Sequence, residues 1–152
     1  MPSMPCGCPG SAMQDFRGKK SRKELGARLD SELRQWPIQL HLVGPGAPYF
    51  DKADLVIAAD CVPFAYANFH PDFLKDKAVV IGCPKLDEID SYADKIAGII
   101  KTGNVKSVTV AHMEVPCCFG LQQIAEEAVK KSGKKIHIEE VTITLQGEKQ
   151  NA

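Results

Sequence analysis

The chain has 152 residues, of which 44% are hydrophobic and 25% charged, as in a globular protein with one domain and its own core. Its 19 Lys and Arg residues balance 19 Asp and Glu residues, so it lacks the net basic charge that nonspecific DNA binding requires. No apolar run approaches the roughly 20 residues of a membrane span, and the N-terminus has no hydrophobic signal core, so we expect a cytoplasmic protein.

The first 37 residues differ in composition from the rest of the chain. The opening segment MPCGCPGS is rich in Pro and Gly, which predicts a turn-rich loop carrying Cys6 and Cys8. The basic stretch RGKKSRK (17–23) follows; it is either a docking patch for an acidic partner or, as is more common for such runs, a solvated linker. We therefore expect a Cys-containing N-terminal loop and linker over 1–37 and an α/β domain over 38–152.

From residue 38 onward, strand patterns alternate with helical ones. Apolar runs predict strands at 38–43, 54–60, 77–82, 107–113 and 137–145. Helical spacing of apolar residues predicts helices over 86–100 and 117–132, and a short helix is favoured over 63–69. The middle strands are nearly continuous apolar runs, which is typical of parallel strands covered on both faces. The pattern predicts a three-layer, Rossmann-like or flavodoxin-like α/β domain with a mostly parallel sheet.

Four of the six cysteines lie where these strands end. Cys61 and Cys83 come directly after two strands, and the adjacent Cys117 and Cys118 follow a third strand after a short turn. Right-handed crossovers bring the carboxyl ends of parallel strands to one edge, so we expect these thiols to gather there. A single Cys is more often a small buried hydrophobic residue. Six at loops or strand ends, without a secretion signal, indicate metal ligation or thiol chemistry instead.

Thiolates are the soft ligands that zinc, copper(I) and iron–sulfur clusters select. The paired C-x2-C knuckles of structural zinc sites are absent, as is the tandem Cys run of bacterial ferredoxins. Dispersed ligands on a preformed fold favour a cluster. The candidate metal ligands are Cys6, Cys8, Cys61, Cys83, Cys117 and Cys118. His112 and Glu114 lie beside the site and could tune it or ligate, although a packed strand residue is the more frequent role of such a His.

Two other functions fit the same cysteines. A metal-free thiol redox enzyme would use Cys117 or Cys118 as the nucleophile at a helix start, where backbone N–H groups stabilise a thiolate. A zinc-binding or structural module would use the cysteines without redox chemistry. A nucleotide or flavin site at the same sheet edge is a less favoured alternative, because no G-x-G-x-x-G motif follows the first strand and no Walker-type lysine loop is present.

Several segments in combination resemble a family of anaerobe proteins described as ferredoxin-like, 4Fe–4S cluster-binding oxidoreductases. They are MPCGCPGS (4–11), SELRQWPIQLHLVGPGAPYF (31–50), LVIAADCVPFAYANFH (55–70), VIGCPKLD (80–87) and HMEVPCCFGL (112–121). The resemblance implies an iron–sulfur cluster of the 4Fe–4S type on the matched cysteines and a role in electron transfer as an oxidoreductase component. It also implies a redox partner, such as a ferredoxin or a hybrid-cluster protein. The balanced charge and the apolar run lengths predict neither nucleic acid nor membrane as a partner. Longer members carry an N-terminal two-cluster ferredoxin module, which we expect this chain to lack.

Overall fold

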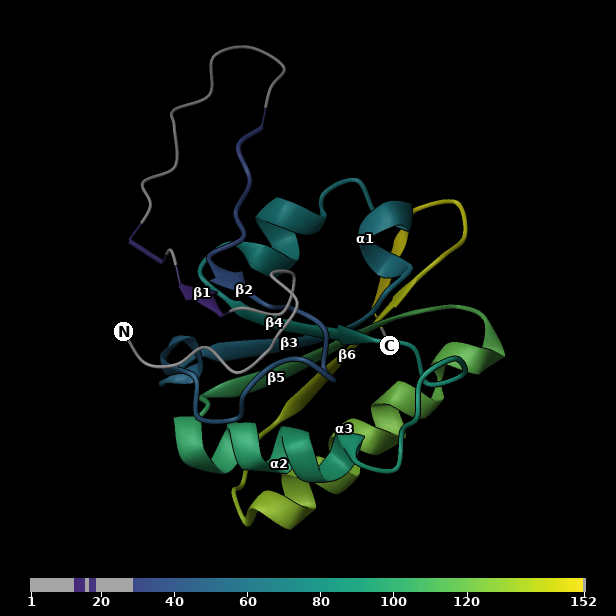
Figure 1. The fold of residues 1–152 in the computed structure, drawn as a ribbon. Coiled ribbons are helices and arrows are strands. Elements are labelled where there is room, and N and C mark those ends of the chain that lie inside the picture. The colour runs from purple at the N-terminus through teal and green to yellow at the C-terminus, as the bar shows by residue number, and fades with distance from the viewer. Residues whose placement is uncertain (1–12, 16, 19–28, 152) are drawn as a thin grey trace.

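A computed structural model describes residues 13–15, 17–18 and 29–151 (Figure 1). In chain order, its elements are β1 (Gln14–Asp15), β2 (Gln35–Trp36), η2 (Pro48–Phe50), β3 (Asp54–Ala59), α1 (Val62–Ala65), η3 (His70–Leu74), β4 (Ala78–Gly82), α2 (Tyr92–Gly103), β5 (Ser107–Met113), η4 (Pro116–Cys118), α3 (Gly120–Ser132), β6 (Ile138–Ile143) and β7 (Lys149–Asn151). Of the short turns, η2 and η4 are 3-10 helical and η3 is π-helical. Within the described ranges, no helix combines the length and apolar character needed to cross a bilayer.

The sheet that organises the domain has five strands in the order β4-β3-β5-β6-β7. The first four run parallel, and β7 pairs antiparallel with β6. Ala59 at the end of β3 lies opposite Gly82 at the end of β4, while Ala58 lies opposite Ala111 of β5. The carboxyl ends of β4, β3 and β5 are therefore neighbours on one edge.

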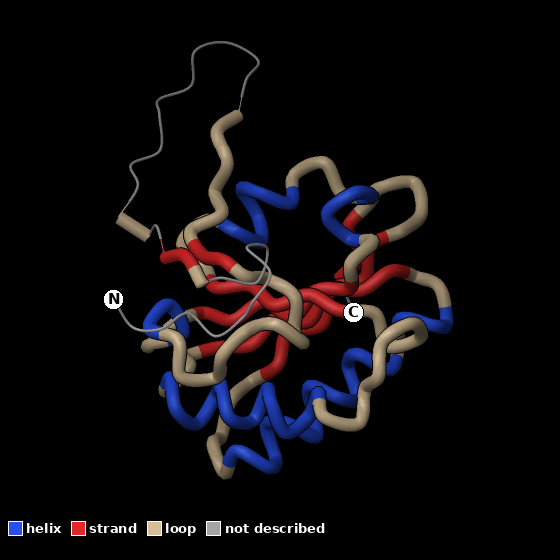
Figure 2. Tube along the Cα trace, viewed as in Figure 1, coloured by secondary structure: helices blue, strands red, loops and turns tan. Residues whose placement is uncertain are grey.

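Helical elements cover both faces of this sheet, which confirms the predicted three-layer α/β fold. Figures 1 and 2 show α2 and α3 side by side on one face, with α1, η3 and the small β1–β2 sheet on the other. In α2, Ile96, Ile99 and Ile100 are fully buried, whereas Asp94 is exposed, as the helical spacing predicts. The five residues of β3 from Leu55 to Ala59 are all buried, as expected for a central strand covered on both faces.

The predicted strand at 38–43 is wrong. Only Gln39 forms a parallel bridge, opposite Ile81 of β4. Leu42 and Val43 then turn back, with the N–H of Val43 donating to the carbonyl of Gln39 at 3.1 Å. The segment is apolar enough for a strand, but its backbone turns after Gln39, ahead of the Gly44–Pro45 pair that breaks the chain.

The predicted helix at 86–100 begins later, at Tyr92. The intervening residues form a loop in which the Asp87 N–H donates to the Cys83 carbonyl at 2.9 Å, and the Cys83 N–H donates to the Asp87 carboxylate at 2.9 Å. These local bonds hold a turn in place of a first helical turn. Leu86 is therefore 83% exposed and does not join the buried stripe.

The residues just before position 38 contact β4, the outermost strand on one side of the sheet. The Gln35 side chain is buried; it donates to the carbonyl of Val79 and accepts from the N–H of Val79, both at 2.8 Å. This carboxamide pairs with β4 much as a neighbouring strand would, and so covers part of an otherwise open edge. The division at residue 37 stays a prediction, with Gln35 tied to the domain that follows.

Candidate functional site at the carboxyl edge of the sheet

The four described cysteines, all free thiols, follow the carboxyl ends of three neighbouring strands. Cys61 lies two residues past β3, Cys83 directly follows β4, and Cys117 and Cys118 form the end of η4, just after β5. Cys6 and Cys8, the other two candidate ligands, lie outside the described residues. The fold thus supplies three thiol-bearing strand ends in the order β4-β3-β5.

Cys61, Cys117 and Cys118 form one group of interacting thiols. Cys118 is buried, whereas Cys61 and Cys117 are exposed. Burial raises the pKa of the Cys118 thiol; a backbone hydrogen bond from Met113 opposes that rise, while Cys117 and Cys61 add to it. Cys61 follows β3 while Cys117 and Cys118 follow β5, so the effect of Cys61 on Cys118 acts between two neighbouring strand ends.

Cys83 has different surroundings. Its sulfur accepts a hydrogen bond from the N–H of Leu86 at 3.4 Å, and its own N–H donates to Asp87. The same Asp87 carboxylate accepts a hydrogen bond from the Tyr92 hydroxyl. A Cβ placed on Gly82 would lie 2.7 Å from that hydroxyl, so glycine is what lets Tyr92 pack here. This bonding ties the loop carrying Cys83 to the start of α2.

The expectation that the thiols at the strand ends gather into one set of ligands is not met by the described residues. Among them, no three His, Cys, Asp or Glu side chains lie close enough to hold one metal ion. Cys61 and Cys117 both raise the pKa of Cys118 from the ends of β3 and β5, and Cys83 lies on the neighbouring strand, in a polar loop.

His112 lies directly beneath this edge and is fully buried in β5. Its Nδ1 lies 2.9 Å from the carbonyl oxygen of Met113, and its Nε2 lies 2.8 Å from the Glu140 carboxylate on β6. Its ring meets that of Phe119 edge-on, with centroids 5.4 Å apart. Both ring nitrogens are engaged, so His112 acts as a packed strand residue that links β5 to β6. Glu114, the other residue expected beside the site, is exposed.

Sequence reasoning missed the polar network around Cys83. His41 stacks at a tilt on Tyr92, with ring centroids 4.8 Å apart. Burial raises the pKa of Asp87, but the Tyr92 hydroxyl, the Cys83 N–H and the charge of His41 together outweigh it and hold that pKa below its usual range. The available signal was Asp87 four residues after Cys83 with Pro84 between them, a pattern typical of a side-chain-capped turn.

Asp87→Asn is expected to destabilise metal-free protein by about 1–3 kcal/mol at neutral pH, because hydrogen bonds to a charged acceptor are lost. The lowered pKa sets the sign of the pH dependence: the carboxylate stabilises the fold above its unfolded pKa, near 4, and this stabilisation is lost as the pH falls through the folded value. Urea unfolding at several pH values should show the gap between wild type and variant closing below about pH 4. An equally large gap in strong acid would contradict this role for Asp87.

Exposed apolar side chains surround the same edge. In the chain, one comes just after the Gln39 bridge to β4, and the others come after the carboxyl ends of β3, β4, β5 and β6. They are Leu42, Phe64, Leu86, Ile89, Phe119 and Leu145. Phe64 is 93% exposed. Contiguous exposed apolar side chains are typical of an interaction surface. We call this set the apolar rim.

Comparisons with known proteins agree with the fold. A family model described as a Rossmann-like domain matches residues 47–151. A curated relative from Archaeoglobus fulgidus, described as an uncharacterized protein, is 35% identical over 116 residues, which cover 76% of this chain and 81% of the relative. No solved structure matches the chain significantly. Neither description mentions an iron–sulfur cluster, so the resemblance to 4Fe–4S oxidoreductases stays a prediction.

Proposed function

Since the chain belongs to the Rossmann-like domain family, we propose that its functional site lies where open parallel sheets bind ligands, beyond the carboxyl ends of the strands. We further propose that the site holds an iron–sulfur cluster of the 4Fe–4S type and serves electron transfer. The observation that carries this proposal is the placement of Cys61, Cys117 and Cys118 at two neighbouring strand ends, where Cys61 and Cys117 both act on the pKa of Cys118.

The donor set has the chemistry that a cluster requires. A cubane would take about four thiolates. Cys61, Cys117 and Cys118 would supply three of them. The fourth would come from Cys83 on the adjacent strand, or from Cys6 or Cys8. When bound, the cluster would supply a one-electron redox centre.

The protein's own residues have two tasks in this proposal. The raised pKa of Cys118 keeps that thiol protonated in the metal-free protein, so cluster binding releases its proton and is favoured by higher pH. The apolar rim supports transient docking of a redox partner, such as a ferredoxin or a hybrid-cluster protein, because small interfaces with an apolar centre suit short-lived electron-transfer complexes.

Anaerobic reconstitution tests the cluster. Wild-type protein treated with iron and sulfide should retain about four of each per chain and give an EPR signal on reduction. A variant with all six cysteines changed to Ser sets the background. Wild-type iron no higher than that background would reject the proposal, and one zinc per chain in untreated protein would favour a zinc module instead.

One observation favours a second candidate, thiol redox chemistry without metal. Cys117 is exposed, and it contributes to the raised pKa of the adjacent, buried Cys118. The raised pKa of Cys118 makes it the poorer nucleophile, so Cys117 would react first. Rapid, selective alkylation of Cys117 in protein that fails to bind iron would favour this candidate, whereas slow, uniform alkylation would count against it.

A further inference from the structure

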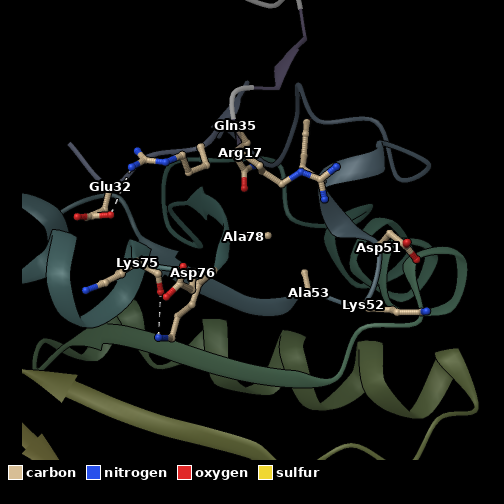
Figure 3. Close-up of a pocket in the computed structure, with 12 residues that line it drawn as sticks. Arg17, Glu32, Gln35, Asp51, Lys52, Ala53, Lys75, Asp76 and Ala78 are labelled. Atoms are coloured by element: carbon tan, nitrogen blue, oxygen red, sulfur yellow. Dashed lines mark hydrogen bonds and ion pairs between the residues drawn. The ribbon is translucent and has the colours of Figure 1, made fainter. Parts of the chain in front are cut away.

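The opposite edge of the sheet contains a pocket that the cysteine site does not use. Its volume is about 370 Å³, which is within the range of small-molecule sites. Ala53 and Ala78, at the amino ends of β3 and β4, line its middle, with charged side chains on either side (Figure 3). Small side chains at these positions keep the pocket open between the two strand ends.

Tyr49 is the residue in this pocket that most directly indicates a ligand. It is 2% exposed, and its hydroxyl is buried without a hydrogen-bond partner in the part of the chain that the structure describes. Burial, with a smaller contribution from Asp15, raises the pKa of Tyr49, so the hydroxyl stays protonated and able to donate. A buried donor without an acceptor is costly, and a ligand acceptor in the pocket would remove that cost.

The charge around the pocket favours an anion. Five of the described lining side chains are cationic and three are anionic, and Asp15, which pairs with Arg17, adds a fourth carboxylate, so the excess is one positive charge. Arg17 is paired with Asp15 at 2.9 Å, whereas Lys52 and Lys75 form no ion pair with any described residue. These two ammonium groups are therefore available to offset the charge of a bound group.

The backbone around the pocket adopts conformations that non-glycine residues rarely adopt. Lys52 has φ 51° and Asp76 has φ 59°, and each lies two residues before a strand, β3 and β4 respectively. Such left-handed positions cost energy and are enriched at ligand sites. They form equivalent turns on two neighbouring strands, one on each side of the pocket (Figure 3).

We propose that this pocket binds a small molecule carrying an oxyanion group, either phosphate or carboxylate. The Tyr49 hydroxyl donates a hydrogen bond to the oxyanion, and Lys52 and Lys75 offset its charge. The site lies at the opposite edge from the cysteines and does not depend on the cluster proposal.

Calorimetric titration of the full chain with inorganic phosphate and with citrate tests both forms of the oxyanion. Saturable binding of either probe supports the proposal and identifies the form, and binding of neither overturns it. Cys61→Ser should bind the probes as wild type does, which separates this outcome from that of the cysteine site.

Tyr49→Phe provides the sharper test, because it removes only the hydroxyl. The variant should bind the probe about tenfold more weakly, while its ligand-free melting temperature should equal or exceed that of wild type, since an unpartnered buried group is gone. A tyrosine with a purely structural role would not give this opposite pair of effects. Unchanged affinity in Tyr49→Phe would overturn the proposal.

Lys75→Gln and its matched control Lys130→Gln distinguish specific binding in the pocket from nonspecific attraction of anions to the protein. Both remove one exposed lysine charge, the first at the pocket and the second on α3. Lys75→Gln should weaken binding several-fold, and Lys130→Gln should leave it unchanged. Equal weakening in both variants would overturn the proposal.

Discussion

Replacing Cys61 with serine is expected to remove most of the iron that reconstituted wild-type protein retains. Cys61 follows β3, the strand that lies between β4 and β5, and its thiol interacts with Cys118 across the β3–β5 boundary. Serine offers a harder oxygen in place of a soft thiolate, so one iron of the cluster would lose its ligand. We expect iron and sulfide per chain to fall about tenfold, measured after anaerobic desalting, with loss of the EPR signal of the reduced protein.

The structure provides controls for this experiment. Cys61 is exposed, so Cys61→Ser should leave the melting temperature of metal-free protein unchanged, which separates ligand loss from unfolding. Cys83→Ser then identifies the fourth ligand: loss of iron assigns that role to Cys83, and retention assigns it to Cys6 or Cys8. Full retention of iron by Cys61→Ser would contradict the proposed site.

The central sheet could be predicted because its strands carry a local signal. Residues 54–60, 77–82 and 107–113 are near-continuous apolar runs, and each became a parallel strand within one residue of the predicted bounds. The end of α3 was equally predictable from the sequence, because Gly133 adopts φ 71°, the left-handed conformation that glycine takes at a helix end. In these places local propensity and tertiary packing agree.

The segment at 38–43 shows where local pattern is insufficient. Whether an apolar stretch becomes a strand depends on a partner with free backbone groups over several residues. Here the Gln35 side chain already forms hydrogen bonds with the backbone N–H and carbonyl of Val79. Only the short stretch around Gln39 therefore pairs with β4, at Ile81. A side chain that takes the place of a strand has no signature in a single sequence.

The candidate site was predictable in location but not in detail. Parallel topology alone places Cys61, Cys83 and Cys117 on one edge, and the structure has this topology. The bonds that hold the Cys83 loop to Asp87 are encoded by no pattern of cysteines. The pocket at the other edge is less predictable still, because the missing partner of the Tyr49 hydroxyl becomes apparent only once distant segments are packed together.

Gly103→Ala at the end of α2 is expected to destabilise the protein by about 1–3 kcal/mol, whereas helix propensity alone predicts that it would stabilise by about 1 kcal/mol. A Cβ on Gly103 would lie 2.6 Å from the carbonyl oxygen of Phe50, which is backbone and belongs to a fully buried residue. The carbonyl of Gly103 also accepts a hydrogen bond from the N–H of Lys52 at 2.7 Å, so α2 cannot move away without losing that bond.

Gly98→Ala on the same helix is the matched control, because its Cβ would meet Pro45 at an ordinary 3.4 Å; it should be neutral or stabilising. Urea unfolding of metal-free variants measures both effects, and equal stability of the two variants would show that α2 does not pack this closely on η2.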